Sequence, residues 1–298
     1  MKKLLTMASV LVALTACQKV ELSEPSGENE QSEQTSESVK TKKFTFIMKG
    51  DFSNEWKPVT RAYMSADGKD LTDVWVLDYD VDGNLLQQLH QAGNTAEDFG
   101  KPIMQLTYGV HRIYFVASRG VNPVLSTDDH TLTFDNVRDT FWKRYDVTVV
   151  ATSNGNRAVT LDRIVTKLRL TFTDAVPADA ASIIITPHTW YYGFDYMTGL
   201  PANAQTDKPS TISIPSTSIG QTGVQASLFS FSTADEWTTD VAISSQSATG
   251  SVLGSATIAS APFQANRVSD YAGPLFSSGG SMTLSLNGEW ADSYAGTW

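Results

Sequence analysis

Apolar and polar residues alternate along most of the chain with a period of two, which is the pattern of half-buried β-strands. The first clear case follows a polar stretch, where Phe44, Phe46 and Met48 are separated by Thr45 and Ile47. Clusters of Gly, Asn, Asp, Ser and Pro separate many further runs of this kind. The runs cover residues 71–80, 104–118, 130–137, 144–152, 157–174, 181–188, 210–217, 226–233, 239–247, 254–263 and 281–290. Many short strands with turn signals between them predict an all-β protein built from β-sandwiches.

Only two stretches lack the strand pattern and favour short helices. These are residues 94–99 and residues 135–145, and Asp135 is a suitable N-cap for the second. The turn-rich sequence SNGN at 153–156 lies between two strand runs and divides the folded part into halves of similar length. The sequence therefore predicts two tandem β-sandwich domains with few short helices, at 42–157 and 158–298.

A polar segment precedes the first strand. Residues 18–41 are dominated by Glu, Ser, Gln, Gly and Pro, and large apolar side chains are almost absent. Such a composition cannot bury enough apolar surface to form a core, so residues 17–41 are predicted to be a disordered tether.

The overall composition supports a folded, acidic protein. The 298 residues are 41% hydrophobic, and the formal net charge is −10. A chain of this sign lacks the clustered Lys and Arg that nucleic-acid phosphates require, so no nucleic-acid partner is predicted. Cys17 is the single cysteine, which excludes an intramolecular disulfide.

The first seventeen residues have the parts of an export signal. Lys2 and Lys3 precede an apolar run from Leu4 to Ala13, which is shorter than the roughly 20 residues of a spanning helix. The run ends in LTAC, residues 14–17, which resembles the lipobox of bacterial lipoproteins. The resemblance implies a signal peptide at 1–16, cleavage before Cys17, and lipid on its sulfur and amino group. The alternative is an ordinary secretory signal with a chance cysteine.

The sequence DYDVDGN at 78–84 has the first half of a calcium-loop pattern, with Asp78, Asp80 and Asp82 before Gly83. A calcium loop requires a bidentate Glu at its twelfth position, and that position is Leu89. The flanking sequences also favour strands over helices. A β-hairpin with an Asp-Gly-Asn turn is therefore preferred, and a weak cation site on the exposed carboxylates stays open.

The chain carries no nucleophile elbow, phosphate-binding loop or dinucleotide-binding loop. Its four histidines have no second ligand at metal-binding spacing, and we expect them at the surface or at strand ends. The sequence therefore predicts no enzyme activity, no cofactor and no metal site. The aromatic stretch at 189–199 favours buried strand residues, with a glycan-stacking surface or a protein-contact patch as the alternatives.

Several segments together resemble the fimbrillin superfamily of type V fimbrial subunits, and within it the lipoprotein anchor subunits. The similar segments lie at 42–50, 59–62, 71–86, 161–172, 195–201 and 261–276. The resemblance implies two transthyretin-like β-sandwich domains, no enzyme activity, and an outer-membrane lipoprotein at the cell surface. It also implies association with fimbrial shaft or accessory subunits by donation of a β-strand.

In that family, an Arg-specific protease removes the first strand of shaft subunits, and a C-terminal strand of the next subunit fills the vacated slot. Transferred to this sequence, the first strand is 43–50, the cleavage site follows Arg61, and the donor lies in Ser281–Trp298. Anchor subunits keep the lipid and the first strand. The long tether and the short stretch after the last strand favour the anchor. A shaft subunit cut after Arg61 and a glycan-binding surface lipoprotein are the alternatives.

Overall fold

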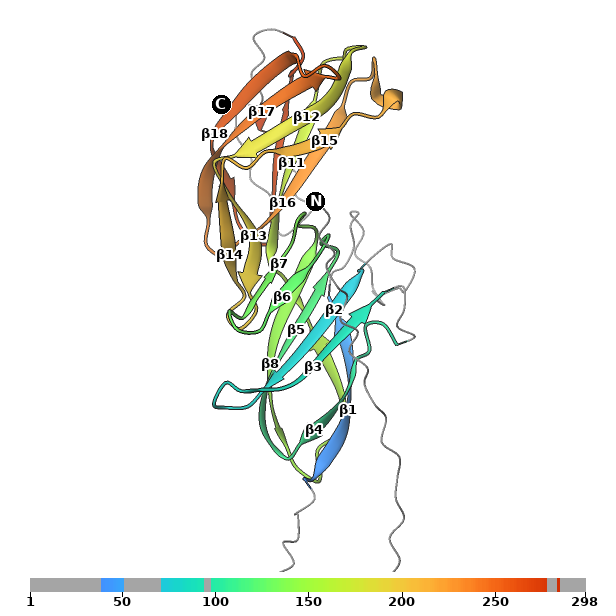
Figure 1. The fold of residues 1–298 in the computed structure, drawn as a ribbon, viewed down its shortest axis with the longest axis vertical. Coiled ribbons are helices and arrows are strands. Elements are labelled where there is room, and N and C mark those ends of the chain that lie inside the picture. The colour runs from blue at the N-terminus through green and yellow to red at the C-terminus, as the bar shows by residue number, and fades with distance from the viewer. Residues whose placement is uncertain (1–38, 51–70, 94–97, 278–282, 285–298) are drawn as a thin grey trace, which may run out of the picture. The chain divides into compact units, whose positions relative to one another are not determined.

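The computed structural model describes residues 39–50, 71–93, 98–277 and 283–284, and these residues are almost entirely β-strand (Figure 1). Within them the only helix is a 3₁₀ turn, η1, at Ser216–Ser218. The all-β prediction is confirmed. The strands are β1 Thr41–Lys49, β2 Asp73–Tyr79, β3 Leu85–Ala92, β4 Ile103–Thr107, β5 Gly109–Ser118, β6 Val124–Ser126, β7 Thr131–Thr133, β8 Thr140–Val149, β9 Asn156–Thr160, β10 Asp162–Arg163, β11 Val165–Phe172, β12 Ala180–Pro187, β13 Thr189–Asp195, β14 Leu200–Thr206, β15 Ser210–Ser213, β16 Val224–Phe231, β17 Trp237–Ser247, β18 Val252–Phe263, β19 Val268–Gly273 and β20 Thr283–Leu284.

The N-terminal half is built around a central sheet of order β10–β8–β5–β2–β3. A small N-terminal sheet of order β4–β1–β9 packs on one face of it. On that face, Val74 and Val76 of β2 join Phe44 and Phe46 of β1 in one buried cluster. The two sheets thus form a sandwich whose core consists of alternate residues of each strand.

The opposite face of the central sheet is also buried. Trp75, Leu77 and Tyr79 of β2 point away from the small N-terminal sheet and belong to a second cluster. A shared sheet of order β14–β13–β7–β6, which combines strands from both halves of the chain, contributes Leu132 and Phe194 to the same cluster. Burial on both faces explains why β2 is an almost continuous apolar run.

The C-terminal half contains a second sandwich. Its first sheet has the order β16–β11–β19–β20 and its second sheet has the order β15–β12–β17–β18. Leu168 and Leu170 from the first sheet share a buried cluster with Ile183, Ile185 and other apolar residues of the second. This cluster is the same one that contains Trp75 and Phe194, so a single apolar core runs through the C-terminal sandwich and the shared sheet.

The predicted boundary between residues 157 and 158 falls inside β9, which pairs in parallel with β1. The hairpin of β13 and β14 comes from the C-terminal half, and its β13 strand pairs with β7 of the N-terminal half. The two-domain division therefore stays a prediction. Strands from the two predicted domains pair with one another near the boundary.

The helix predicted at 135–145 is wrong. Residues 140–149 form β8, which pairs along its whole length with β5. Phe141, Tyr145, Val147 and Val149 lie at intervals of two or four residues and face the N-terminal core. The strand predicted at 144–152 is confirmed over 144–149 and begins four residues earlier, at Thr140. The helix predicted at 94–99 lies mostly outside the described residues.

Two runs predicted as single strands are divided between sheets. Residues 104–118 break at Tyr108, so that β4 belongs to the small N-terminal sheet and β5 to the central sheet. Residues 157–174 divide into β9, β10 and β11, which belong to three different sheets. Apolar periodicity identifies strands and gives no signal where a chain crosses between stacked sheets. Within the described residues, no helix has the length and apolar composition of a membrane span.

Candidate functional site

The first strand, β1, lies in the middle of its sheet. It pairs antiparallel with β4, with Phe44 opposite Met104, and parallel with β9, with Met48 opposite Val159. A strand in this position has both of its edges hydrogen-bonded. The β4 ladder covers Thr41–Thr45 and the β9 ladder covers Thr45–Lys49, so removal of β1 would leave an unpaired edge on each of these neighbours, offset along the strand.

The inward side chains of β1 are core residues. Phe44, Phe46 and Met48 are buried, whereas Thr45 and Ile47 point outward. The Phe46 ring lies 5.0 Å from the ring of Phe115 in an edge contact and 5.9 Å from the ring of Phe44. Departure of β1 would therefore expose an apolar slot in addition to the unpaired backbone. The sequence pattern alone predicted these three inward residues correctly.

Backbone contacts from three separate loops also fasten β1. The Thr45 amide donates to the Gly155 carbonyl at 2.7 Å, and the Phe46 amide donates to the Pro102 carbonyl at 3.0 Å. The Leu161 amide donates to the Lys49 carbonyl at 2.7 Å. Gly155 lies so close to the strand that a β-carbon there would collide with the carbonyl oxygen of Lys43. No sequence pattern identified Gly155, because the contact joins segments more than 100 residues apart.

Replacing Gly155 with alanine is expected to loosen β1. The added methyl group must displace the backbone at Lys43, at a cost of about 1–3 kcal/mol, which is typical of overpacking. Hydrogen exchange should then show faster exchange of the Thr45 and Phe46 amides, with little change in the C-terminal sandwich. Thr152→Ala, which shortens an exposed side chain in the same loop, is the control. Equal exchange rates in both variants would contradict this account.

The two residues predicted to be modified lie outside the described residues. These are Cys17, the lipid attachment point, and Arg61, the processing site between β1 and β2. Of the predicted donor segment Ser281–Trp298, the structure describes only Thr283 and Leu284. These two residues form β20 and pair with Ala272 and Tyr271 of β19.

Asp174 holds the chain just before this donor segment. Its carboxylate accepts hydrogen bonds from the amides of Leu275, Phe276 and Ser277 at 2.7–3.0 Å. Burial acts to raise the pKa of Asp174, but the three N–H donors outweigh it and the pKa lies below its usual value. Sequence reasoning missed Asp174, because its partners follow it by about a hundred residues.

The predicted hairpin at 78–84 is confirmed. β2 and β3 pair antiparallel, and Gly83 adopts a positive φ of 88° in the turn between them. The Asp80 carboxylate accepts hydrogen bonds from the amides of Asp82 and Asn84 and from the Asn84 side chain. These bonds, led by the one from the Asn84 side chain, hold the pKa of Asp80 below its usual range.

Asp78 and Asp80 point to different environments. Asp78 is buried against His111, whose Nδ1 lies 2.9 Å and 3.0 Å from the two carboxylate oxygens. The other ring nitrogen of His111 donates to the Thr107 carbonyl at 2.9 Å. The expectation that all four histidines lie at the surface or at strand ends is therefore wrong for His111. Within the described part of the chain, no group of three or more His, Cys, Asp or Glu residues could hold a metal ion.

The Asp78–His111 pair predicts a dependence of stability on pH. Burial raises the pKa of Asp78 above its ordinary value of 3.8, and the hydrogen bond and charge of His111 oppose this shift only in part. The Asp78 carboxyl group thus binds its proton more tightly in the folded protein than in the unfolded chain. The stability that this proton contributes is present below pH 3.8 and is lost as pH rises through the raised pKa. Asp78→Asn, which can still bond to His111, should lose this component. Urea unfolding across pH 3–8 should show that the free energy of unfolding of the variant rises relative to that of the wild type as pH rises. Parallel pH profiles of the two proteins would contradict the assignment.

The aromatic stretch at 189–199 forms β13 and the turn after it, and most of its rings are core residues. Trp190, Tyr192, Phe194 and Tyr196 are all at most 4% exposed, and Tyr191 is half-buried. The hydroxyl groups of Tyr196 and Tyr79 lie 2.7 Å apart, and Trp142 donates its indole N–H to the Tyr196 carbonyl at 2.7 Å. The interpretation of these aromatics as buried strand residues is confirmed.

Several solved structures have similar folds. A Bacteroides ovatus protein described as a candidate adhesin has 13% identity and a TM-score of 0.48, over 84% of this chain and 94% of the other. The tip fimbrial protein Mfa3 of Porphyromonas gingivalis has 12% identity and a TM-score of 0.46, over 82% and 99%. A fimbrial assembly protein of Parabacteroides distasonis has 10% identity and a TM-score of 0.46, over 83% and 96%.

The sequence matches no protein-family model, and no curated protein is similar to it in sequence. The three structural likenesses have TM-scores below 0.5 and concern the course of the backbone. The functional argument therefore rests on the residues of this chain.

Proposed function

We propose that this chain is a lipid-anchored structural subunit of a cell-surface fimbrium, which holds the fimbrium at the outer membrane and joins other subunits by exchange of β-strands. The lipid would be attached to Cys17, after removal of residues 1–16. The acidic tether at 17–41 would place the folded part at a distance from the membrane surface.

The observation that carries the proposal is the position of β1. This strand pairs with β4 on one edge and β9 on the other and supplies three core side chains, yet it is the first of the described strands and is joined to β2 through the segment that contains Arg61. A single cut after Arg61 would leave β1 held only by hydrogen bonds and packing. A strand from another subunit could then replace it, because β-augmentation supplies both the backbone bonds and the alternate apolar side chains.

The anchor and the shaft subunit differ in whether this cut occurs. A subunit that keeps Cys17 and β1 has a filled slot and stays attached to the membrane, which is the anchor role that we favour. A subunit that begins at Ala62 has an open slot and can polymerise. The glycan-binding alternative receives little support from β13, because three of its four rings are buried in the core and Tyr191 is half-buried.

The mature N-terminus, measured by mass spectrometry on protein from the native cells, tests the proposal. We expect an acylated Cys17 followed by an intact chain through Arg61. A mature chain that starts at Ala62 would reject the anchor role and leave the shaft subunit.

Substitution of the cysteine supplies a second test. Cys17→Ala should move the protein from the membrane fraction to the soluble fraction, since stable anchoring requires more than one acyl chain and all of the proposed chains are attached at Cys17. Ser23→Ala in the tether is the control and should leave the protein in the membrane fraction. Membrane association of Cys17→Ala equal to that of the control would refute lipid anchoring.

A further inference from the structure

Three segments meet at the end of the N-terminal sandwich where β1 begins (Figure 1). The Tyr108 amide, in the turn between β4 and β5, donates to the Lys40 carbonyl at 3.0 Å. The Lys42 ammonium, at the start of β1, donates to the Ala151 carbonyl in the turn after β8 at 2.6 Å. We call this end of the sandwich the β1 tip, and it consists of residues 39–43, 107–110 and 149–155.

Apolar side chains project into solvent at the β1 tip. Val39, Tyr108, Val110 and Val150 are 73%, 41%, 47% and 47% exposed. In the described part of the chain, Tyr108 is the only aromatic residue among the exposed large apolar side chains. The ends of β5 and β8 are paired here, which brings Tyr108, Val110 and Val150 together. The tip therefore carries an exposed apolar patch that includes an aromatic ring.

The same end carries positive charge and no negative charge. Lys40 and Lys43 are exposed, and Lys42 is half-buried. The segments 39–49, 103–110 and 147–160 contain no Asp or Glu, although the whole protein has a formal net charge of −10. Among the described residues, no carboxylate forms an ion pair with any of these three lysines. An acidic protein thus presents a basic and apolar end.

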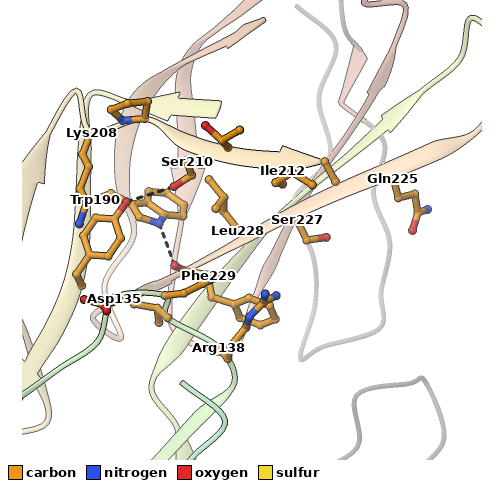
Figure 2. A pocket seen from close by; sticks show the side chains of 16 residues that line it. Asp135, Arg138, Trp190, Lys208, Ser210, Ile212, Gln225, Ser227, Leu228 and Phe229 are labelled. Atoms are coloured by element: carbon orange, nitrogen blue, oxygen red, sulfur yellow. Dashed lines mark hydrogen bonds between the residues drawn. The ribbon is translucent and has the colours of Figure 1, made fainter. Parts of the chain in front are cut away.

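A second group of cations lies in a different kind of place. A cleft of about 520 Å³ in the C-terminal sandwich has Arg138 and Lys208 in its lining (Figure 2). Asp135 adds a carboxylate to that lining, and the Lys208 ammonium lies 3.9 Å from the centre of the Tyr192 ring. A flat surface cannot enter a cleft, whereas the turns of the β1 tip project from the end of a sandwich.

We propose that the β1 tip rests on the surface of an anionic lipid membrane. Exposed lysines attract phosphate-bearing headgroups, and aliphatic side chains enter the boundary between headgroups and acyl chains. A tyrosine ring suits this boundary because its body is apolar and its hydroxyl group is polar. The β1 tip supplies all three kinds of group within a few residues of one another.

The course of the chain favours a membrane over other partners. The tip begins at Val39, directly after the predicted tether from Cys17. A flexible chain of 21 residues, the length of 18–38, has an average end-to-end distance of about 25 Å. Lipid on Cys17 would therefore keep the tip within reach of the membrane, and in this respect the inference rests on the proposed function. The contact does not replace the anchor, since stable anchoring takes at least two signals, so the expected release of Cys17→Ala is unchanged.

Sedimentation with lipid vesicles tests the proposal. The protein is the mature chain, residues 17–298, with Cys17→Ala, so that no acyl chain contributes and the acidic tether is kept. Vesicles of phosphatidylglycerol and phosphatidylcholine in equal parts should bind it saturably. Vesicles of phosphatidylcholine alone should bind it at least tenfold more weakly. High salt should lower the affinity for the anionic vesicles, because salt screens exposed charges.

Substitutions separate the tip from the overall charge of the protein. Lys40→Gln with Lys43→Gln should weaken binding to the anionic vesicles at least tenfold. Tyr108→Ser should weaken it several-fold, although it removes no charge. Arg138→Gln with Lys208→Gln, in the cleft, removes the same charge as the lysine variant and is the control. The control should bind the vesicles as tightly as the unsubstituted protein.

Three results would overturn the proposal. They are absence of binding to the anionic vesicles, equal affinities of the lysine variant and its control, and self-association that Tyr108→Ser abolishes, which would assign the tip to a second copy. If Tyr108→Ser does not fold, the lysine variant and its control decide. None of these results alters the lipid on Cys17, which the mature N-terminus reports, so the two proposals fail separately.

Discussion

Replacing Phe46 with alanine should lower the free energy of unfolding by about 3–5 kcal/mol, the range for removal of a buried phenylalanine. Its ring is fully buried in the middle of β1 and lies 5.0 Å from Phe115 and 6.1 Å from Tyr145. The surrounding residues belong to two sheets and cannot collapse into the space without moving both backbones. Urea unfolding of the mature protein measures the change.

Ile47→Ala is the matched control for this prediction. Ile47 follows Phe46 in the same strand, is 38% exposed and points outward, so its truncation should change stability by no more than about 0.5 kcal/mol. The prediction also bears on strand exchange, because weaker packing of β1 against the core should make β1 dissociate faster. In Phe46→Ala, the amides of β1 should exchange faster than those of β11. Similar losses of stability in the two variants would mean that β1 is not held by its inward side chains.

The sequence could predict β1 because all the required information is local. A strand with one buried face needs alternate apolar residues, and Phe44, Phe46 and Met48 supply them. The hairpin at 78–84 was equally accessible, since Gly83 permits the positive φ of the turn. The strand predicted at 144–152 was accessible for the same reason, whereas the helix predicted at 135–145 overlooked that Phe141 already lies on the buried face of β8.

Other features depend on contacts between distant segments and leave no local trace. Gly155 matters because the Lys43 carbonyl passes close to it, and Asp174 matters because the chain returns to it at Leu275. The full burial of β2 follows from a shared sheet assembled from both halves of the chain. A sequence pattern can mark β2 as buried on both sides, but it cannot tell which strands cover it.

The ion pair between Asp139 and Arg163 should contribute strongly to stability, because the two side chains are only 1% and 4% exposed. The Arg163 guanidinium donates from Nε and one terminal nitrogen to the two carboxylate oxygens of Asp139, at 2.7 Å and 3.0 Å. Its other terminal nitrogen donates to Asn266 at 3.0 Å, and the group also lies 4.7 Å from the ring of Phe141. Arg163 thereby ties the segment after β9 to the loop before β19.

Asp139→Ala is expected to lower the free energy of unfolding by about 3–5 kcal/mol, because it leaves the buried guanidinium without its charge partner. Asp162, which is adjacent to Arg163 in the sequence, provides the control. Asp162 pairs with Lys143 at 2.8 Å, but the two side chains are 62% and 41% exposed, so Asp162→Ala should cost at most about 1 kcal/mol. The double variant Asp139→Leu with Arg163→Met should recover much of the loss, since apolar groups of similar volume replace buried pairs at little cost. Urea unfolding of all three variants tests the assignment, and a double variant no more stable than Asp139→Ala would show that the loss has another origin.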